Sequence, residues 1–173
     1  MRGLWIVLAP LIASCGASST RIATPHTASF PTELHGFRFG MNVDEAHAAC
    51  AGEWHATDVM AADPAHGLPR ARSAFCTPPL REWSIDLDLR GDPERLAVIG
   101  ETRSGSDAAD ARGALDTARR ELEASYGAPT RVRRGAYYEW EIEGGRIALV
   151  RHAPSPCGLA PGWAISVVYE PSR

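Results

Sequence analysis

The stretch "EWSIDLDLRGDPERLAVIGETR", residues 82–103, decides the fold that this sequence predicts. Its first part alternates strictly, with Trp83, Ile85, Leu87 and Leu89 separated by polar residues. Such alternation is typical of an antiparallel strand that buries one face and leaves the other in water. The turn residues "GDPE" lead into a second apolar segment, which predicts a β-hairpin. We therefore expect a domain built on antiparallel sheet.

Two segments with helical periodicity flank this hairpin. Residues 42–52 begin with Asn42 as a candidate N-cap and Glu45 at the reciprocal position of a capping box. Residues 106–127 carry an apolar stripe and end at Gly127, shortly before a proline. The members of the stripe are Ala108, Ala111, Leu115, Ala118, Leu122 and Tyr126.

Strand patterns follow the second helix as they follow the first. Residues 137–152 predict two strands joined by a tight Gly144–Gly145 turn, and residues 163–170 predict a final strand. Residues 42–103 and 106–170 are thus similar in length and in the order of their elements. We expect an α+β fold of two helix-plus-antiparallel-sheet halves in tandem, with the helices packed on one face of the sheet.

The chain has 173 residues, of which 45% are hydrophobic and 23% charged, as is ordinary for a globular domain. A core of this size needs no metal to fold, and we expect no metal and no cofactor. The formal net charge of -3 gives no reason to expect nucleic acid as a partner. The sequence contains no lysine and no G-x-S-x-G motif, which excludes lysine-dependent chemistry and gives no sign of a nucleophile elbow.

Residues 1–14 are typical of a signal peptide, with an early arginine and an apolar segment too short to span a bilayer. The residues "IASC" (12–15) are an aliphatic residue, two small residues and a cysteine, and here the chain resembles bacterial lipoprotein precursors. The resemblance implies that Cys15 is acylated and anchors the mature protein in membrane lipid. An ordinary cleaved signal followed by an incidental cysteine is the alternative.

Residues 15–33 are rich in Ser, Thr, Ala and Pro and show no periodicity, so we expect them to form a flexible tether. A single domain at residues 34–173 follows. Gly16, in place of an aspartate after the cysteine, favours sorting to the outer membrane. We therefore expect a lipid-anchored protein of the bacterial cell envelope, at the outer membrane and facing the periplasm.

Two short segments carry a resemblance of the domain itself. "FGMNVDEAHAAC" (39–50) is similar to the entry to the first helix of SmpA-like envelope lipoproteins and of β-lactamase-inhibitor-like proteins. "YGAPT" (126–130) is similar to the exit from their second helix. Residues 53–71 would then form a loop longer than the compact pattern of these proteins. The resemblance implies a tandem α+β domain in the cell envelope.

Three cysteines remain after the anchor, and the envelope beyond the inner membrane is oxidising, so we expect a disulfide. Cys50 and Cys76 are the natural pair because they are the closest in the chain. Such a bridge would add about 3 to 4 kcal/mol by restricting the unfolded chain. Sequence alone leaves the other pairings open, and Cys157 would remain unpaired in a loop.

A metal site is an alternative use of some of these residues. His47 and Cys50 lie three residues apart on one helix face, and Cys76, His55 or His66 would supply the further ligands of a tetrahedral site. A disulfide beside a packed histidine accounts for the same residues without a metal.

Carboxylates recur on the polar faces of the predicted strands. Asp86 and Asp88 point the same way on one strand, and Glu139 and Glu141, with Glu143, do so on another. A carboxylate pair could hydrolyse a glycoside if one member lay in an apolar pocket. On a hydrated face, these side chains instead predict a surface that binds a partner. Trp54 either anchors that partner or packs beneath the long loop.

These features predict a non-enzymatic, membrane-anchored envelope lipoprotein whose domain binds another envelope protein or takes part in envelope assembly. A periplasmic module that binds a small ligand or a metal is the alternative. A hydrolase that uses the paired carboxylates is a third possibility.

Overall fold

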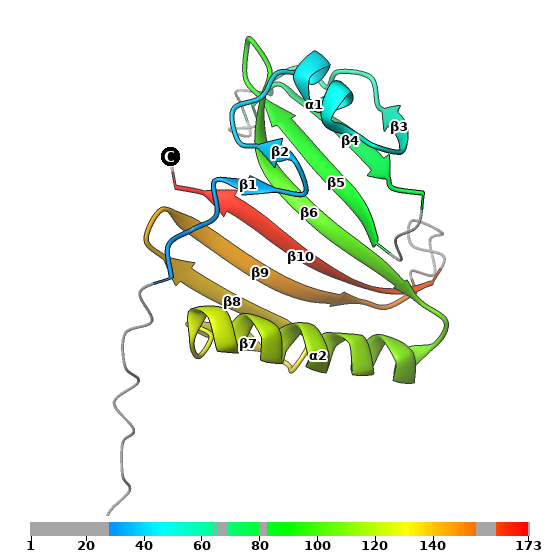
Figure 1. Ribbon diagram of the computed structural model, residues 1–173, viewed down its shortest axis with the longest axis vertical. Helices are drawn as coiled ribbons and strands as arrows, with labels where there is room; N and C mark the ends of the chain where they lie inside the picture. Colours follow the sequence, from blue (N-terminus) through cyan, green and yellow to red (C-terminus); the bar gives the residue numbers. More distant parts are fainter. Residues whose placement is uncertain (1–27, 64, 66–68, 80–82, 155–161, 173) are drawn as a thin grey trace, which may run out of the picture.

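The computed structural model describes residues 28–63, 65, 69–79, 83–154 and 162–172 (Figure 1). Eight strands in this part of the chain form one antiparallel sheet in the order β3-β4-β5-β6-β10-β9-β8-β7. Their bounds are β3 Glu53–Ala56, β4 Ala71–Thr77, β5 Trp83–Arg90, β6 Arg95–Gly105, β7 Arg131–Arg133, β8 Tyr137–Ile142, β9 Gly145–His152 and β10 Trp163–Pro171. A small hairpin, β1 Glu33–Leu34 and β2 Phe37–Arg38, and two helices, α1 Val43–Ala49 and α2 Ala108–Tyr126, complete the described elements.

The predicted architecture, two helix-plus-sheet halves in tandem with the helices packed on one face, is wrong. The described part of the chain is mostly one large antiparallel sheet, with 47% of the described residues in strands and 21% in helices, of which there are two. The physical reason lies in β6, whose eleven residues pair with β5 along one edge and with β10 along the other. Because the last strand of the chain joins the first half directly, the halves share a continuous sheet.

Several local elements follow the sequence prediction. The capping box of α1 is confirmed: the Glu45 N–H donates to Asn42 Oδ1 at 2.9 Å, and the Asn42 N–H donates to Glu45 Oε2 at 2.8 Å. Helix α2 ends at Gly127, whose φ of 80° is the left-handed conformation that glycine adopts easily. Its N-cap is Asp107, one residue after the expected start of the helical segment. None of the helices in the described part of the chain is long and apolar enough to cross a membrane.

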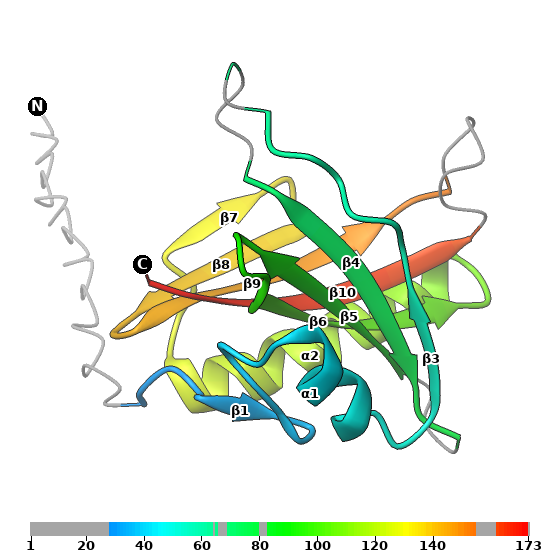
Figure 2. The same ribbon diagram turned by 90° about the horizontal axis from the view of Figure 1, so that it is seen from above.

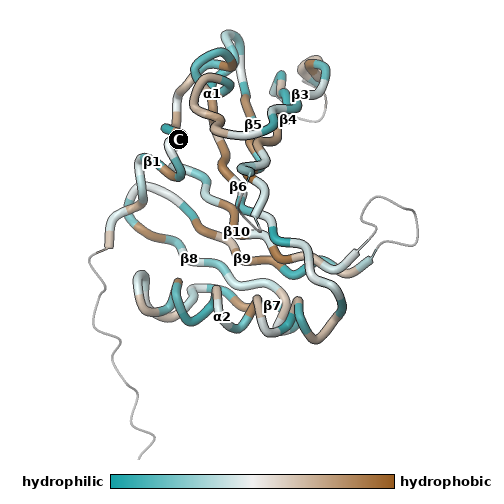
Figure 3. Tube along the Cα trace, turned by 45° about the vertical axis from the view of Figure 1, so that its right-hand side comes forward, coloured by the Kyte–Doolittle hydropathy of each residue, from teal (hydrophilic) through white to brown (hydrophobic). Residues whose placement is uncertain are grey.

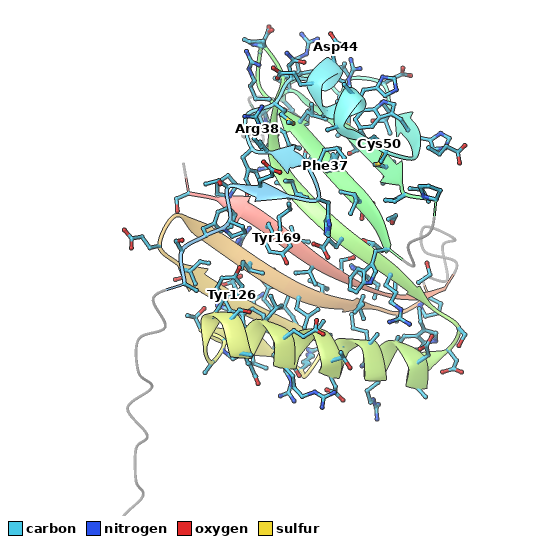
Figure 4. All side chains as sticks on the ribbon, viewed as in Figure 1. Phe37, Arg38, Asp44, Cys50, Tyr126 and Tyr169 are labelled. Atoms are coloured by element: carbon cyan, nitrogen blue, oxygen red, sulfur yellow. A yellow bond between two sulfur atoms is a disulfide. The ribbon has the colours of Figure 1, made fainter. Side chains whose placement is uncertain are left out.

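Buried side chains form two core clusters. The α2 cluster joins α2 to β8, β9 and β10 and includes Leu115, Leu122, Trp140, Leu149 and Val167. The α1 cluster joins α1 and β2 to β4, β5 and β6 and includes Phe37, Ala46, Ile85, Leu87 and Ile99. The apolar segments of these strands are brown in Figure 3. Figure 4 labels Tyr169, a member of the α2 cluster, and Tyr126, which packs against it; it also labels Phe37, a member of the α1 cluster, and Cys50, which packs against that one.

The other side of the sheet, turned away from both clusters, is here called the open face. In the view of Figure 2, α2 and β1 lie on one side of the sheet and the open face is turned to the other. Side chains alternate between the two sides of every strand. The strand register therefore aligns Phe75, Asp86, Gly100 and Val168 in one row across the open face.

Candidate functional site

A groove with a volume of about 340 Å³ crosses the open face. The sequence places it there because β4, β6, β9 and β10 each turn a small or apolar side chain toward this side, and β5 contributes Asp86 and Asp88. Its lining combines apolar and polar groups: Phe75, Val98, Gly100, Val150 and Val168, with Ser73, Asp86, Asp88, His152 and Ser166. A mixed lining of this kind is typical of a surface that accepts a ligand or a partner side chain.

Gly100 lies in the row that crosses the groove. A Cβ atom at this position would lie 3.3 Å from Asp86 Cβ and 3.7 Å from Asp86 Oδ2. Glycine is unfavourable inside a strand and often marks a place where another group comes close to the backbone. Here the missing side chain leaves room beside the Asp86 carboxylate.

Four side chains form a continuous hydrogen-bonded chain across the groove. Thr102 Oγ1 donates to Asp86 Oδ2 at 2.5 Å, Ser166 Oγ lies 2.8 Å from Thr102 Oγ1, and His152 Nε2 lies 3.0 Å from Ser166 Oγ. An ionised carboxylate only accepts hydrogen bonds, so the single proton of Thr102 is directed at Asp86. With Asp86 ionised, the proton count assigns Ser166 as donor to Thr102 and the Nε2–H of His152 as donor to Ser166.

The donor and acceptor roles along these hydrogen bonds determine what chemistry Ser166 can perform. A serine nucleophile must donate its proton to a neighbouring histidine acting as base. Here Ser166 donates toward Asp86 through Thr102 and accepts from His152, which is the reverse polarity. Ser166 is also buried. The chain of hydrogen bonds therefore orients Asp86 and does not activate Ser166.

The Asp86 carboxylate lies half-buried beneath the groove. Burial raises the pKa of this group, although the hydrogen bond from Thr102 and the nearby His152 oppose the shift. Among the described residues Asp86 has no ion pair, and its Oδ1 accepts no hydrogen bond. Asp86 is thus a partly desolvated carboxylate that contacts no arginine among the described residues, and the His152 ring reaches it only through Ser166 and Thr102.

One end of the open face, which adjoins the groove at Asp88, carries alternating charges, here called the ion-pair ladder. Six side chains belong to it in spatial order: Asp88, Arg90, Glu170, Arg146, Glu139 and Arg131. Arg90 contacts Asp88 at 2.7 Å and Glu170 at 3.0 Å, and Arg146 joins Glu170 to Glu139. Burial would raise the pKa of Glu170, but hydrogen bonds from Arg146 and Arg90 outweigh it and hold that pKa below its ordinary value.

The carboxylates that the sequence singled out as a partner-binding surface therefore divide into different environments. Asp86 lines the groove, and Asp88 also lines it but is paired with Arg90. Glu141 is exposed on β8. Glu139 corrects the expectation of a hydrated carboxylate: it is only 1% exposed, because Arg131, Arg146 and the Tyr137 hydroxyl surround it.

Trp54 and His47 lie away from the groove. Trp54, on β3, is half-buried against the α1 cluster and stacks on the His47 ring with 5.1 Å between the ring centroids. The residues expected to form a loop at 53–71 thus begin with a strand, β3, which pairs with β4. Its backbone partner Cys76 is also part of the α1 cluster.

The disulfide between Cys50 and Cys76 is confirmed, with the two Cα atoms 5.7 Å apart. The bridge uses the two thiols that a metal site would have needed. His55 lies beside the Glu53 carboxylate at 3.1 Å, and His66 lies outside the described residues. Over the part of the chain that the structure describes, no group of three or more potential metal-ligating side chains occurs. Cys15 and Cys157 also lie outside the described residues.

A second cleft, about 420 Å³ in volume, lies between α2 and the strands β5 and β6. Its lining includes Arg103 and Asp110. Asp110 accepts a hydrogen bond from the Ser106 N–H and so belongs to the start of α2, and Arg103 also has a partner within the protein. Because these charges are already engaged, the groove on the open face is the stronger candidate site.

The sequence prediction missed most of the groove. Phe75, Gly100, His152 and Ser166 come from four strands, and only the sheet order brings them together. Two features of the sequence could have indicated the groove. They are a glycine inside the strand at residues 95–105 and a serine inside the apolar strand at residues 163–171.

Comparison of the chain with protein-family models, with curated proteins and with solved structures found no match in any of the three. The function is therefore argued from the chemistry of the site.

Proposed function

We propose that this chain is a non-enzymatic protein-binding module of the bacterial cell envelope, whose open face contacts a protein partner. In this proposal acylated Cys15 holds the protein to membrane lipid, at the outer membrane and facing the periplasm. The residues between Cys15 and the domain serve as a tether that lets the open face reach its partner.

The observation that carries the proposal is the groove on the open face. Phe75 is 39% exposed there, beside a half-buried carboxylate that has no ion pair among the described residues. Exposed aromatic side chains and partly desolvated charges are the features that contribute most to protein interfaces. The polarity of the Ser166 hydrogen bonds favours binding over nucleophilic chemistry.

The openness of the sheet face also favours a protein partner over a small molecule. An open sheet face offers a broad surface with fixed side-chain positions, whereas a small-molecule site encloses most of its ligand. The ion-pair ladder borders the groove and holds its own charges in place, so a partner would meet an ordered polar rim around an apolar centre.

The proposal is tested by capturing the full chain from intact bacterial envelopes after chemical crosslinking and identifying partners by mass spectrometry. Phe75→Glu places a charge in the groove. Ala124→Glu is the matched control, because it introduces the same charge at an exposed position on α2, away from the open face.

We expect one recurrent partner, in comparable amount, with the wild type and with Ala124→Glu, and its loss with Phe75→Glu. Circular dichroism of both variants verifies that the fold is kept. Recovery of the same partner by both variants would contradict the proposal, as would recovery of abundant bystander proteins alone.

A further inference from the structure

Asp86 differs from the other buried and half-buried carboxylates of the open face in what surrounds it. Asp88, Glu170 and Glu139 each contact at least one arginine. Asp86 receives a hydrogen bond on Oδ2 from Thr102, while its Oδ1 has no partner among the described residues. The His152 ring reaches Asp86 only through Ser166 and Thr102. A half-buried carboxylate with no cation in direct contact gains most from a cation supplied from outside.

The neighbours of Asp86 define the shape of that cation. Phe75 is directly opposite Asp86 in the β4–β5 register, and its ring is partly exposed. Val150 and Val168 line the groove from β9 and β10. The space above Gly100 separates the carboxylate from these apolar groups. An incoming side chain would thus meet a negative charge, an aromatic ring and an aliphatic wall together.

We propose that the groove binds an arginine side chain of the partner protein, with its guanidinium against Asp86 Oδ1 and the Phe75 ring. A guanidinium is planar, stacks on aromatic rings and forms directed hydrogen bonds to carboxylates, whereas an ammonium is a compact and strongly hydrated charge. The methylene groups of the arginine would cover Val150 and Val168. This inference rests on the proposed function and names the chemistry of the partner.

The assignment is tested on the purified full chain, labelled with ¹⁵N, by titration with N-acetyl-arginine methylamide. N-acetyl-citrulline methylamide has nearly the same shape without the charge, and N-acetyl-lysine methylamide has the charge without the planar group. Chemical-shift changes at the backbone amides of Phe75, Gly100 and Val168 report binding in the groove.

Two variants and one matched control separate charge from shape. Asp86→Asn removes the charge, and Gly100→Ala places a methyl group 3.3 Å from Asp86 Cβ while keeping the carboxylate. Glu141→Gln is the control, since Glu141 is an exposed carboxylate of the same sheet and is not part of the groove lining.

We expect saturable binding of the arginine compound with a millimolar Kd, and about fivefold weaker binding to Asp86→Asn. Gly100→Ala is expected to weaken binding as well, and Glu141→Gln to leave it unchanged. Equal shifts with the citrulline compound, equal affinity for the lysine compound, or unchanged binding by Asp86→Asn would each overturn the assignment.

The titration needs no cellular partner, so it can fail independently of the proposed function. If a partner is captured through Phe75 and the arginine compound does not bind, only the arginine assignment is lost. If the compound binds and no partner is ever captured, the proposed function is lost.

Discussion

The two ends of the open face carry similar residues in opposite electrostatic situations. At the ion-pair ladder, Glu170 lies between Arg90 and Arg146, and its pKa lies below the ordinary value because those hydrogen bonds outweigh burial. At the groove, Asp86 has no arginine, and its pKa lies above the ordinary value because burial dominates. In the ladder each carboxylate contacts an arginine of the same sheet. In the groove Asp86 contacts no arginine among the described residues, and this difference is the basis of the proposal that a partner binds there.

The largest effect on stability is expected at the ladder, from Glu139→Ala. Glu139 is buried and is the common acceptor for Arg131, Arg146 and the Tyr137 hydroxyl. Its removal should lower the free energy of unfolding by about 2 kcal/mol, measured by urea denaturation. Glu141→Ala, at an exposed position of the same strand, should change it by less than about 0.5 kcal/mol. Similar values for the two variants would remove the distinction between ladder and surface.

A smaller, pH-dependent effect is expected for Glu170→Gln. Because the pKa of Glu170 is lowered in the folded state, its contribution is present above the ordinary glutamate pKa and is lost as pH falls through the lowered value. The variant should be less stable than the wild type by about 1 kcal/mol near neutral pH. Thermal unfolding across the acid range should show the two proteins converging. A difference that stays constant down to strong acid would show that the carboxylate charge is not the cause.

The smallest effect, with the opposite sign, is expected for Asp86→Asn. Because the pKa of Asp86 is raised in the folded state, its contribution is present below the ordinary aspartate pKa and is lost as pH rises through the raised value. The asparagine variant, which keeps an acceptor for Thr102, should equal or exceed the wild-type stability near neutral pH, by less than about 0.5 kcal/mol. Chemical denaturation at neutral and acidic pH measures this difference. A loss of more than about 1 kcal/mol would assign Asp86 to the structure and not to binding.

Features that arise from residues close together in the chain could be predicted from the sequence. The β5–β6 hairpin, the capping box at Asn42, the end of α2 at Gly127 and the Cys50–Cys76 bridge all follow from residues close together in the chain. Alternation and capping are local rules, and here the structure agrees with them.

Features set by distant pairing could not be predicted in the same way. That β10 pairs with β6, and so joins the two halves into one sheet, depends on contacts between residues some 60 positions apart, such as Glu101 and Val167. The burial of Glu139 has a different cause. Arg131 and Arg146 are close to it in the chain, on the neighbouring strands β7 and β9, but alternation alone does not show that their side chains cover the polar face at this point. The lipid anchor at Cys15 and the resemblance to envelope proteins stay predictions.

The contrast between the two ends of the open face is tested most directly by site-specific photo-crosslinking in intact cells. A photoreactive amino acid is placed either at Phe75, in the groove, or at Glu141, on the exposed part of β8 near the ladder. Both sites are accessible, and each variant is otherwise the native chain. The account predicts a discrete crosslinked protein from Phe75, in clearly higher yield than from Glu141, which lies toward the rim of the contact surface. Equal crosslinking from both sites, or crosslinking from Glu141 alone, would contradict it.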